Sequence, residues 1–399
     1  MSTANTESFK ESFKESFKES FKELSKESPN LLITGSTPID DGFYMPAEFA
    51  PIQKVWMVWP YRADNWRQQA IPAKAAYAAV AMAIRPFAQV AVLVIADDYQ
   101  ACRDSLADDI EVISMPSNDA WARDIVPTFL INDSGELRAC DWTFNAWGGD
   151  YDGLYTPWDD DDRLAARLCE YLGIKRYRTD GFVMEGGAFH VDGEGTILTT
   201  RMCLLSPGRN PHLTERQIED KLKAYLNAQK VLWIDDGIDP DETTGHIDDI
   251  ACFARPGEVV CLFTDDPEHP FYEATQKAYQ QLSNMTDAQG RRLKVHKLCC
   301  TKHPVTLPDN YDIVQSDDAK ARRTGDICIA SYANFLICND AIIVPQYDDI
   351  NDSLAIAQLE KVFPQHQVVG VHTKEIVFGG GNIHCITQQQ PAVKKCTNS

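Results

Sequence analysis

Two short stretches, EGGAFHV at Glu185–Val191 and GGGNIHC at Gly379–Cys385, share one pattern although they lie far apart in the chain. In each, two glycines are followed by a variable residue, an apolar residue and a histidine, and an apolar strand-like segment comes before. Similar segments that recur within a chain indicate repeated structural units. The pattern therefore predicts an α/β protein in which each repeated unit directs a polar turn towards a shared centre.

Two further polar turns extend the series. Asp124, in NDAWARDIVPT (Asn118–Thr128), lies 61 residues before Glu185, and His246, in DETTGHIDDI (Asp241–Ile250), lies 61 residues after it. Equal steps are expected from repeats of similar length, although any one step can also arise by chance. Five residues of these turns form a candidate set of a thiol, a histidine and three carboxylates: Cys385, His246, Asp124, Glu185 and Asp248.

Helix and strand signals alternate along the chain. Thr214 and Gln217 form a capping box that opens a helix with apolar residues on one face. Acidic residues at the start of Asp159–Leu172, and Gly173 after it, are typical of a second helix. The sequence also predicts a helix at 353–363 and strands at 88–96, 230–234 and 367–371.

The composition is that of an ordinary globular chain with an acidic surface. The 399 residues, 44% of them apolar, are enough for a sizeable core. A net charge of −21 argues against nucleic acid and anionic membranes as partners and favours a small cationic ligand. Twelve cysteines without a C-x-x-C pair predict free thiols in a reducing cytoplasm. The longest apolar run, Val90–Ala96, is too short to span a membrane.

The N-terminal segment differs from the rest of the chain. ESFK recurs four times between Glu7 and Lys22, so the phenylalanines are spaced four residues apart. On a helix this period drifts about 40° per repeat, which is a poor coiled-coil seam. We therefore predict that residues 1–36 form a tail with FKES repeats, disordered or loosely helical, and that residues 37–399 form a single catalytic domain. A partner-binding helix is the alternative for the tail.

The thiol, the histidine and the carboxylates suit the hydrolysis of a guanidine. A guanidinium is planar and permanently protonated, so two carboxylates can hold its N–H edges by charge-assisted hydrogen bonds. A thiolate can then attack the carbon from the face of the plane, while a histidine protonates the departing ammonia and later activates water. Each residue alone is more often structural than reactive, as free cysteines show. The five together favour the chemical interpretation.

Seven stretches resemble the agmatine deiminase (agmatine iminohydrolase) family of the guanidino-group-modifying enzymes. They run from about Gly42 to Ala392 and occur in the family's order: GFYMPAEFAP, WMVWPYRADNWR, NDAWARDIVPTF, EGGAFHVDGEGTILTTRMCLLSPGRNPHL, GHIDD, SYANFLICNDAIIVPQY and GGGNIHCITQQQP. The resemblance implies a pentein fold, a five-bladed pseudo-symmetric α/β propeller. It also implies hydrolysis of agmatine to N-carbamoylputrescine and ammonia, a step of putrescine and polyamine biosynthesis.

The resemblance further implies a role for each of the five polar residues. Cys385 would be the nucleophile, and it would carry the substrate as a covalent thiouronium. His246 would be the general acid and base. Asp124 and Asp248 would clamp the guanidinium, and Glu185 would bind the substrate and orient His246.

Five other positions follow from the same comparison. Trp121 matches a substrate-pocket position, and Glu242 and Thr243 lie in a loop that would approach the amine end of the substrate. Val126 stands where the family usually has Gly, and Asp249 stands where Asn or Glu is common. A non-glycine residue needs an unstrained backbone, so we expect Val126 to affect the local geometry of its turn.

Arginine deiminase, peptidyl-arginine deiminase and amidinotransferase are the alternative activities. An α-carboxylate would demand a dedicated cation, and none stands out in the motifs; a secreted peptidyl-arginine enzyme would be expected to carry a signal sequence. An amidinotransferase would form the same thiouronium and pass it to an amine, which residue types alone do not exclude. His384 is a poor base, because neighbours on an extended segment point to opposite faces.

The predicted chemistry needs no metal and no cofactor, since the nucleophile and the proton carrier are side chains. The expected partner is a small cationic guanidine. A homo-oligomer, in the form of a dimer, is the expected assembly.

Deleting residues 1–30 separates a catalytic protein from one that acts through its tail. We expect the truncated chain to release ammonia from agmatine at the rate of the full chain, because all five chemical residues lie outside the tail. Loss of activity on truncation, with the fold retained by circular dichroism, would contradict the predicted division of the chain.

Overall fold

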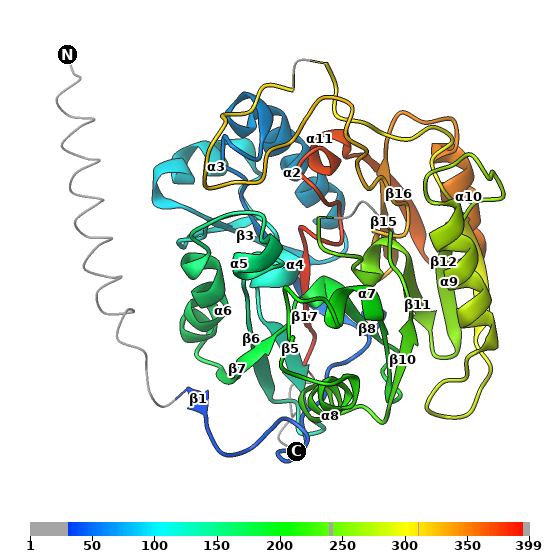
Figure 1. Ribbon diagram of the computed structural model, residues 1–399. Coiled ribbons are helices and arrows are strands. Elements are labelled where there is room, and N and C mark those ends of the chain that lie inside the picture. The colour runs from blue at the N-terminus through cyan, green and yellow to red at the C-terminus, as the bar shows by residue number, and fades with distance from the viewer. Residues whose placement is uncertain (1–30, 239–241, 310, 394–399) are drawn as a thin grey trace.

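A repeated arrangement of strands and helices accounts for most of the chain. The computed structural model describes residues 31–238, 242–309 and 311–393, and the strands of this part form five sheets (Figure 1). Each sheet contains an antiparallel pair, and a helix leads from this pair to a strand that runs parallel to the second member. The predicted mixed α/β class and its repeated units are confirmed.

Three of the sheets consist of this arrangement alone. In each, the helix comes between the second and third strands in chain order. Their elements are β8 (Phe189–Val191), β9 (Thr196–Thr200), α8 (Glu215–Leu226) and β10 (Lys230–Ile234); β11 (Ala251–Arg255), β12 (Glu258–Phe263), α9 (Tyr272–Asn284) and β13 (Lys294–Cys299); and β14 (Leu336–Cys338), β15 (Ala341–Gln346), α10 (Asp352–Val362) and β16 (Gln367–His372).

The other two sheets have a fourth strand. One joins β5 (Thr128–Ile131), β6 (Leu137–Thr143), β7 (Lys175–Val183) and β1 (Leu32–Ile33), with α6 (Asp159–Leu172) as its helix. The last joins β17 (Gln388–Pro391), β2 (Ile52–Val58), β3 (Gln89–Val94) and β4 (Glu111–Ser114), with α2 (Ile71–Ile84) and α3 (Tyr99–Ser105). Because β17 pairs with β2, the last strand of the described chain joins the sheet of its second strand.

The predicted tail lies mostly outside the described residues, which begin at residue 31. Leu32 and Ile33 belong to the predicted tail, yet they pair in parallel with Arg176 and Tyr177 of β7. The sheet therefore begins before the boundary that we expected at residue 36.

Local sequence signals place several elements within a residue or two. The capping box is present, since Thr214 Oγ1 accepts the Gln217 N–H at 3.3 Å, and α8 buries Ile218, Leu222 and Leu226. The helix α6 and the strand β10 have the predicted bounds, and β3, α10 and β16 lie within two residues of theirs. These predictions are confirmed.

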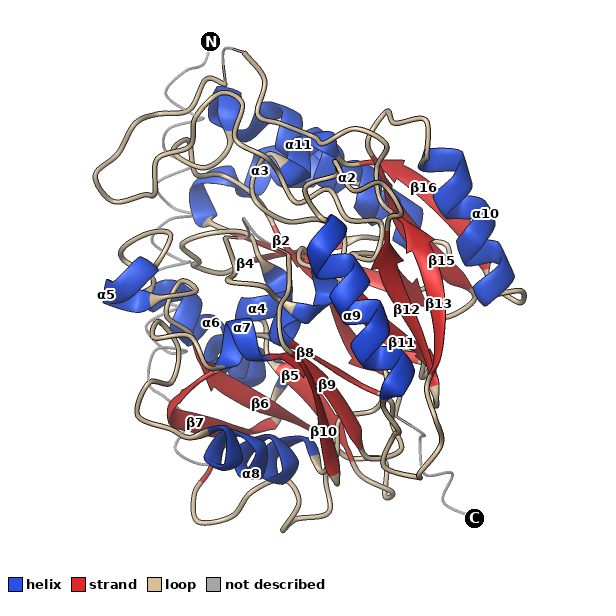
Figure 2. Cartoon of the chain, turned by 45° about the vertical axis from the view of Figure 1, so that its right-hand side comes forward, coloured by secondary structure: helices blue, strands red, loops and turns tan. Residues whose placement is uncertain are grey.

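The helices lie outside the strands, and the polar turns lie inside. Figure 2 shows α9 and α10 covering β11–β16 on one side of the molecule, and the apolar faces of α9 and α10 contact β12, β13, β15 and β16. Among the described residues, no helix combines the length and the apolar character needed to cross a membrane.

A polar turn comes directly before the first strand of each antiparallel pair. The short helix α4 (Ala122–Ile125) precedes β5, and 3-10 turns at Gly186–Ala188 and Ile247–Asp249 precede β8 and β11. The turn at Gly186–Ala188 contacts each of the other two. Residues 331–334 precede β14, and residues 379–386 precede β17. The repeat of the fold therefore brings five distant segments to one place.

Candidate active site

Gly187 marks the centre of the cluster formed by the polar turns. A Cβ atom added to it would lie 2.6 Å from His246 Nδ1, 2.9 Å from Asp248 Oδ2 and 3.2 Å from Asp124 Oδ1. Three side chains from two repeated units therefore crowd around the turn of a third unit, and only a glycine fits between them. All of them are buried, so their charges are poorly solvated.

Asp124 is held by uncharged donors. Its Oδ1 accepts the Gly187 N–H at 2.9 Å, and its Oδ2 accepts the Trp147 Nε1–H at 2.9 Å. Burial raises the pKa of Asp124 to about 6; Asp248 and Glu185 add to the rise, while His246 opposes it. Asp124 thus carries a negative charge that a bound cation would stabilise.

Glu185 and His246 form the second part of the cluster. Glu185 Oε1 accepts the Arg209 Nε–H at 2.7 Å, and its Oε2 lies 3.8 Å from His246 Nε2. Burial would raise the pKa of Glu185, but Arg209 and His246 hold it below its usual value. Burial would lower the pKa of His246, yet Asp124, Cys203 and Glu185 raise it well above the ordinary value. His246 is therefore an imidazolium in the empty site.

Cys385 lies against an acid and an amide. Its Sγ is 3.5 Å from Asp248 Oδ2 and 3.1 Å from Asn334 Nδ2. Burial, followed by Asp248, Asp249 and Asp124, raises the pKa of the Cys385 thiol well above its usual value. Cys385 is therefore a neutral thiol in this structure.

Asn334 is a site residue that the sequence reasoning missed. Its Nδ2 contacts both Cys385 Sγ and Asp249 Oδ1, the latter at 3.0 Å. Its Oδ1 accepts the backbone N–H of His384 at 2.9 Å and that of Cys385 at 3.3 Å. Asn334 ends the polar turn before β14, so its place before a strand was the available signal. The long segment after β13 hid it, because it breaks the equal spacing of the earlier turns.

Trp147 and Arg209 were missed as well. Trp147 follows β6, and Arg209 lies between α7 (Arg201–Leu204) and α8. Arg209 donates to the backbone oxygens of Trp147 and Thr243, so one guanidinium links both segments to Glu185. Arginine in a loop gives no sequence signal of this kind, since its partners come from other units.

The expected backbone at His384 was wrong. Residues 383–386 form a turn rather than an extended segment, because His384 N–H bonds to Asn334 and Ile386 N–H bonds to Asn382 O at 3.0 Å. Two neighbouring side chains can then face one group. His384 Nδ1 lies 2.8 Å from Asp248 Oδ2, the same oxygen that Cys385 approaches.

The glycine run before Cys385 packs closely against neighbouring side chains. A Cβ atom at Gly381 would lie 2.5 Å from Trp121 Cζ3 and 3.1 Å from Cys385 Cβ, and one at Gly380 would collide with Glu242. Trp121 packs on Trp66 with ring centroids 5.3 Å apart. Glycine is needed at these positions because a side chain would collide with Trp121, Cys385 or Glu242.

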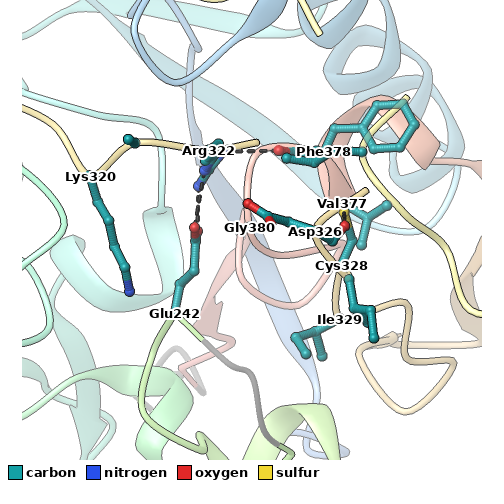
Figure 3. Close-up of a pocket in the computed structure, with 12 residues that line it drawn as sticks. Glu242, Lys320, Arg322, Asp326, Cys328, Ile329, Val377, Phe378 and Gly380 are labelled. Carbon is teal, nitrogen blue, oxygen red and sulfur yellow. Dashed lines mark hydrogen bonds and ion pairs between the residues drawn. The ribbon is translucent and has the colours of Figure 1, made fainter. Parts of the chain in front are cut away.

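A cavity of about 320 Å³ lies beside this glycine run and is lined by Glu242, Arg322, Phe378 and Gly380, among others (Figure 3). Glu242 forms a two-point ion pair with Arg322, whose Nε lies 3.0 Å from Glu242 Oε1. Arg322 also donates to the backbone oxygens of Phe378 at 2.9 Å and Gly379 at 2.6 Å. Glu242 thus lines this cavity with a cation beside it, and its approach to the amine end of the substrate stays a prediction.

The remaining predicted positions are Thr243, Val126 and Asp249. Thr243 Oγ1 accepts the His246 backbone N–H at 3.3 Å, so it supports the histidine from behind. Val126 has φ −79° and ψ 143°, an ordinary extended conformation, so its turn is unstrained without glycine. Asp249 is buried and bonded to Asn334, which places it next to the thiol.

Comparison with known proteins identifies the family. The sequence profile of the Porphyromonas-type peptidyl-arginine deiminase family matches residues 44–391. The chain belongs to this family. Among its relatives is an agmatine deiminase from Ectopseudomonas mendocina, 49% identical over 90% of this chain and 98% of the relative. The family resemblance expected from the sequence is confirmed.

Two solved structures are similar across the whole family domain. The structure titled agmatine deiminase of Enterococcus faecalis catalysing its reaction has a TM-score of 0.89 and 58% identity, over 90% of this chain and 99% of that one. A Cys-to-Ser agmatine deiminase of C. jejuni with substrate bound has a TM-score of 0.74 and 26% identity, over 88% and 97% of the chains. The E. faecalis structure supports a similar backbone throughout the matched region.

Among the described residues, three buried groups of side chains have potential metal-ligand atoms within 4.8 Å of one another. The groups are Glu48, His190 and His384; Glu185, Cys203 and His246; and Asp248, Asp249 and Cys385. Proximity alone does not make them metal sites. Arg123 already neutralises Glu48, and Arg209 neutralises Glu185. The expectation of a metal-free reaction stays a prediction.

The pKa of Asp124 predicts an acid limit for a guanidinium ligand. The clamp needs the carboxylate form, so we expect kcat/KM for agmatine to fall about tenfold per pH unit below about pH 6. A bound guanidinium stabilises the carboxylate, so the corresponding limit in kcat should lie at lower pH. The measurement is the pH dependence of ammonia release between pH 4.5 and pH 9. A flat kcat/KM from pH 7 to pH 5 would contradict this assignment.

Proposed function

We propose that the protein hydrolyses agmatine to N-carbamoylputrescine and ammonia, a reaction that supplies a precursor of putrescine. One observation carries the proposal. The imidazolium of His246 and the carboxylates of Asp124 and Asp248 meet at Gly187, and the thiol of Cys385 lies 3.5 Å from Asp248 Oδ2. Relatives named agmatine deiminases, with 49% identity and more over nine-tenths of the chain, support the choice of substrate.

Binding of the guanidinium adds a positive charge to the cluster, beside the imidazolium of His246. Asp124 and Asp248 take its N–H edges, as charge-assisted bonds to carboxylates do. The arriving cation lowers the pKa of the Cys385 thiol, since it offsets the carboxylates that raise it. The thiol proton leaves to solvent, and Asn334 Nδ2–H remains as a donor to the thiolate.

The chemical steps then alternate at one carbon. The Cys385 thiolate forms a C–S bond, and the C–N bond breaks as His246 gives its proton to the departing ammonia. The product of this step is a thiouronium on Cys385. Neutral His246 next takes a proton from water, whose oxygen attacks the same carbon. The C–S bond breaks, the thiolate returns, the remaining hydroxyl proton passes to solvent, and the ureido product leaves.

The Glu242–Arg322 pair supports agmatine over arginine. The amine of agmatine needs an anion at the outer end of the site, and Glu242 provides one. The α-carboxylate of arginine would need a free cation. The N–H groups of Arg322 already contact Glu242 and the backbone oxygens of Phe378, Gly379 and Asn65, so Arg322 has no donor to spare.

An amidinotransferase would require an amine as acceptor in place of water. Supplying glycine or ornithine together with agmatine tests for it, because a transfer would give a new guanidine. We expect only the ureido product.

We further propose a pentein architecture, with the five sheets as blades of a propeller and the polar turns at its axis. One catalytic domain would include the described residues, and the FKES repeats would lie outside it. A dimer, a cytoplasmic location and no nucleic-acid partner stay predictions from the sequence.

Replacing Cys385 with Ser tests the proposed nucleophile. We expect the C385S variant to lose ammonia release from agmatine by about a thousandfold or more, because a serine hydroxyl here has no base to activate it. Agmatine binding by calorimetry should persist. Cys299→Ser, which removes a thiol from β13, is the matched control and should keep full activity. Full turnover by C385S would overturn the proposal.

Glu242→Gln tests the choice between an amine and a carboxylate. We expect kcat/KM for agmatine to fall about ten- to a hundredfold, since a charge-assisted hydrogen bond is lost. Arg322 then gains free donors, so the preference for agmatine over arginine should narrow. Asp326→Asn is the control, because Asp326 is an acid of the same cavity outside the ion pair. Equal losses in both variants would indicate a general field effect instead.

A further inference from the structure

Behind Asp248 lies a chain of buried charged side chains that the proposed mechanism does not use. His384 Nδ1 is 2.8 Å from Asp248 Oδ2, and its Nε2 is 3.0 Å from both oxygens of Glu48. Glu48 in turn accepts the Arg123 Nη1–H at 3.1 Å. His190 stacks on His384 with ring centroids 5.1 Å apart. All five side chains are almost completely buried.

The contacts determine the charge of His384. Each of its ring nitrogens faces a carboxylate oxygen, and only an imidazolium has a donor at both positions. Burial and Arg123 oppose this charge, but Glu48 and Asp248 outweigh them and raise the pKa of His384. The pKa of the stacked His190 is lowered by burial to about 4, so His190 is neutral. The charges of Glu48, Arg123, His384 and Asp248 therefore cancel.

Asp124 and Asp248, the two carboxylates proposed to hold the guanidinium, thus differ in the charge of their hydrogen-bond donors. The hydrogen bonds of Asp124 come from the uncharged donors Gly187 and Trp147, whereas Asp248 accepts from an imidazolium. Burial would raise the pKa of Asp248, but the hydrogen bond from His384 helps to hold it below the usual value. Asp124 can take up a proton near neutral pH, while Asp248 remains ionised.

We propose that His384, anchored by Glu48, is a positioning residue that keeps Asp248 ionised and oriented towards the substrate guanidinium. It does not carry the proton of the reaction, because both of its N–H groups are held by carboxylates. The proposal rests on the proposed function and extends it to residues with no chemical step of their own. Charged and titratable groups face the pair from two sides: Glu48, Arg123 and His190 from behind, and His246, Cys385, Asp249 and Asp124 from the front.

The wild-type protein provides the first test. If only Asp124 titrates, the acid limb of kcat/KM has a slope of one, which is about tenfold per pH unit. A slope of two would mean that Asp248 also takes up a proton, and it would overturn the proposal without any variant. If the wild type releases no ammonia from agmatine, the proposed function itself fails, and this outcome is distinct from a wrong slope.

His384→Gln provides the second test, since glutamine is neutral and cannot donate to both carboxylates. We expect the acid limb to move to higher pH and to steepen towards two protons. The deficit relative to wild type should then grow by about tenfold for each pH unit below the new midpoint. A loss of packing alone would lower activity by the same factor at every pH.

His190→Gln is the matched control, because His190 is equally buried in the same stack but has no bond to Asp248. It should keep the wild-type slope and midpoint. If His384→Gln does not fold, Glu48→Gln replaces it, with the same direction expected because His384 loses its anchor. A wild-type acid limb in either folded variant, or equal changes in His190→Gln, overturns the positioning role.

Discussion

The site depends on the burial of several carboxylates around Gly187, beside the imidazolium of His246. A buried carboxylate is costly unless a cation or several donors face it. Arg209 faces Glu185 and His384 faces Asp248, so these two acids are stabilised by the protein. Asp124 has only uncharged donors, and burial raises its pKa. A bound guanidinium adds a further positive charge beside His246, so substrate binding and activation of the thiol are the same electrostatic event.

The repeat of the fold makes this burial feasible. Each of the five sheets begins with a strand that follows a polar turn, so segments far apart in sequence meet at one place. Glycine is required where two turns approach most closely, at Gly187 among the acids and at Gly381 between Trp121 and the thiol. The helices outside the sheets bury the apolar faces and leave the inner ends of the strands to polar side chains.

Part of the structure could be predicted because its causes are local. The bounds of α6, α8 and β10 follow from capping residues and from the period of apolar positions. The pairing of β17 with β2 could not be predicted in this way, since it joins segments more than 300 residues apart in the sequence. His384 shows the same limit. Its neighbours suggest an extended strand, but hydrogen bonds to Asn334 turn the backbone and bring it to Asp248.

By itself the sequence determined which reactive groups are present: one thiol among polar turns, one histidine and three acids, a set that suits a guanidine. It did so because nucleophilicity and charge type belong to the individual side chain. The tertiary structure alone decided the charge state of each group and which neighbours support it. Asn334 on the thiol, Arg209 on Glu185 and His384 on Asp248 are contacts between different repeated units. A pKa depends on burial and on the charges within a few ångströms, and only the folded chain brings those together.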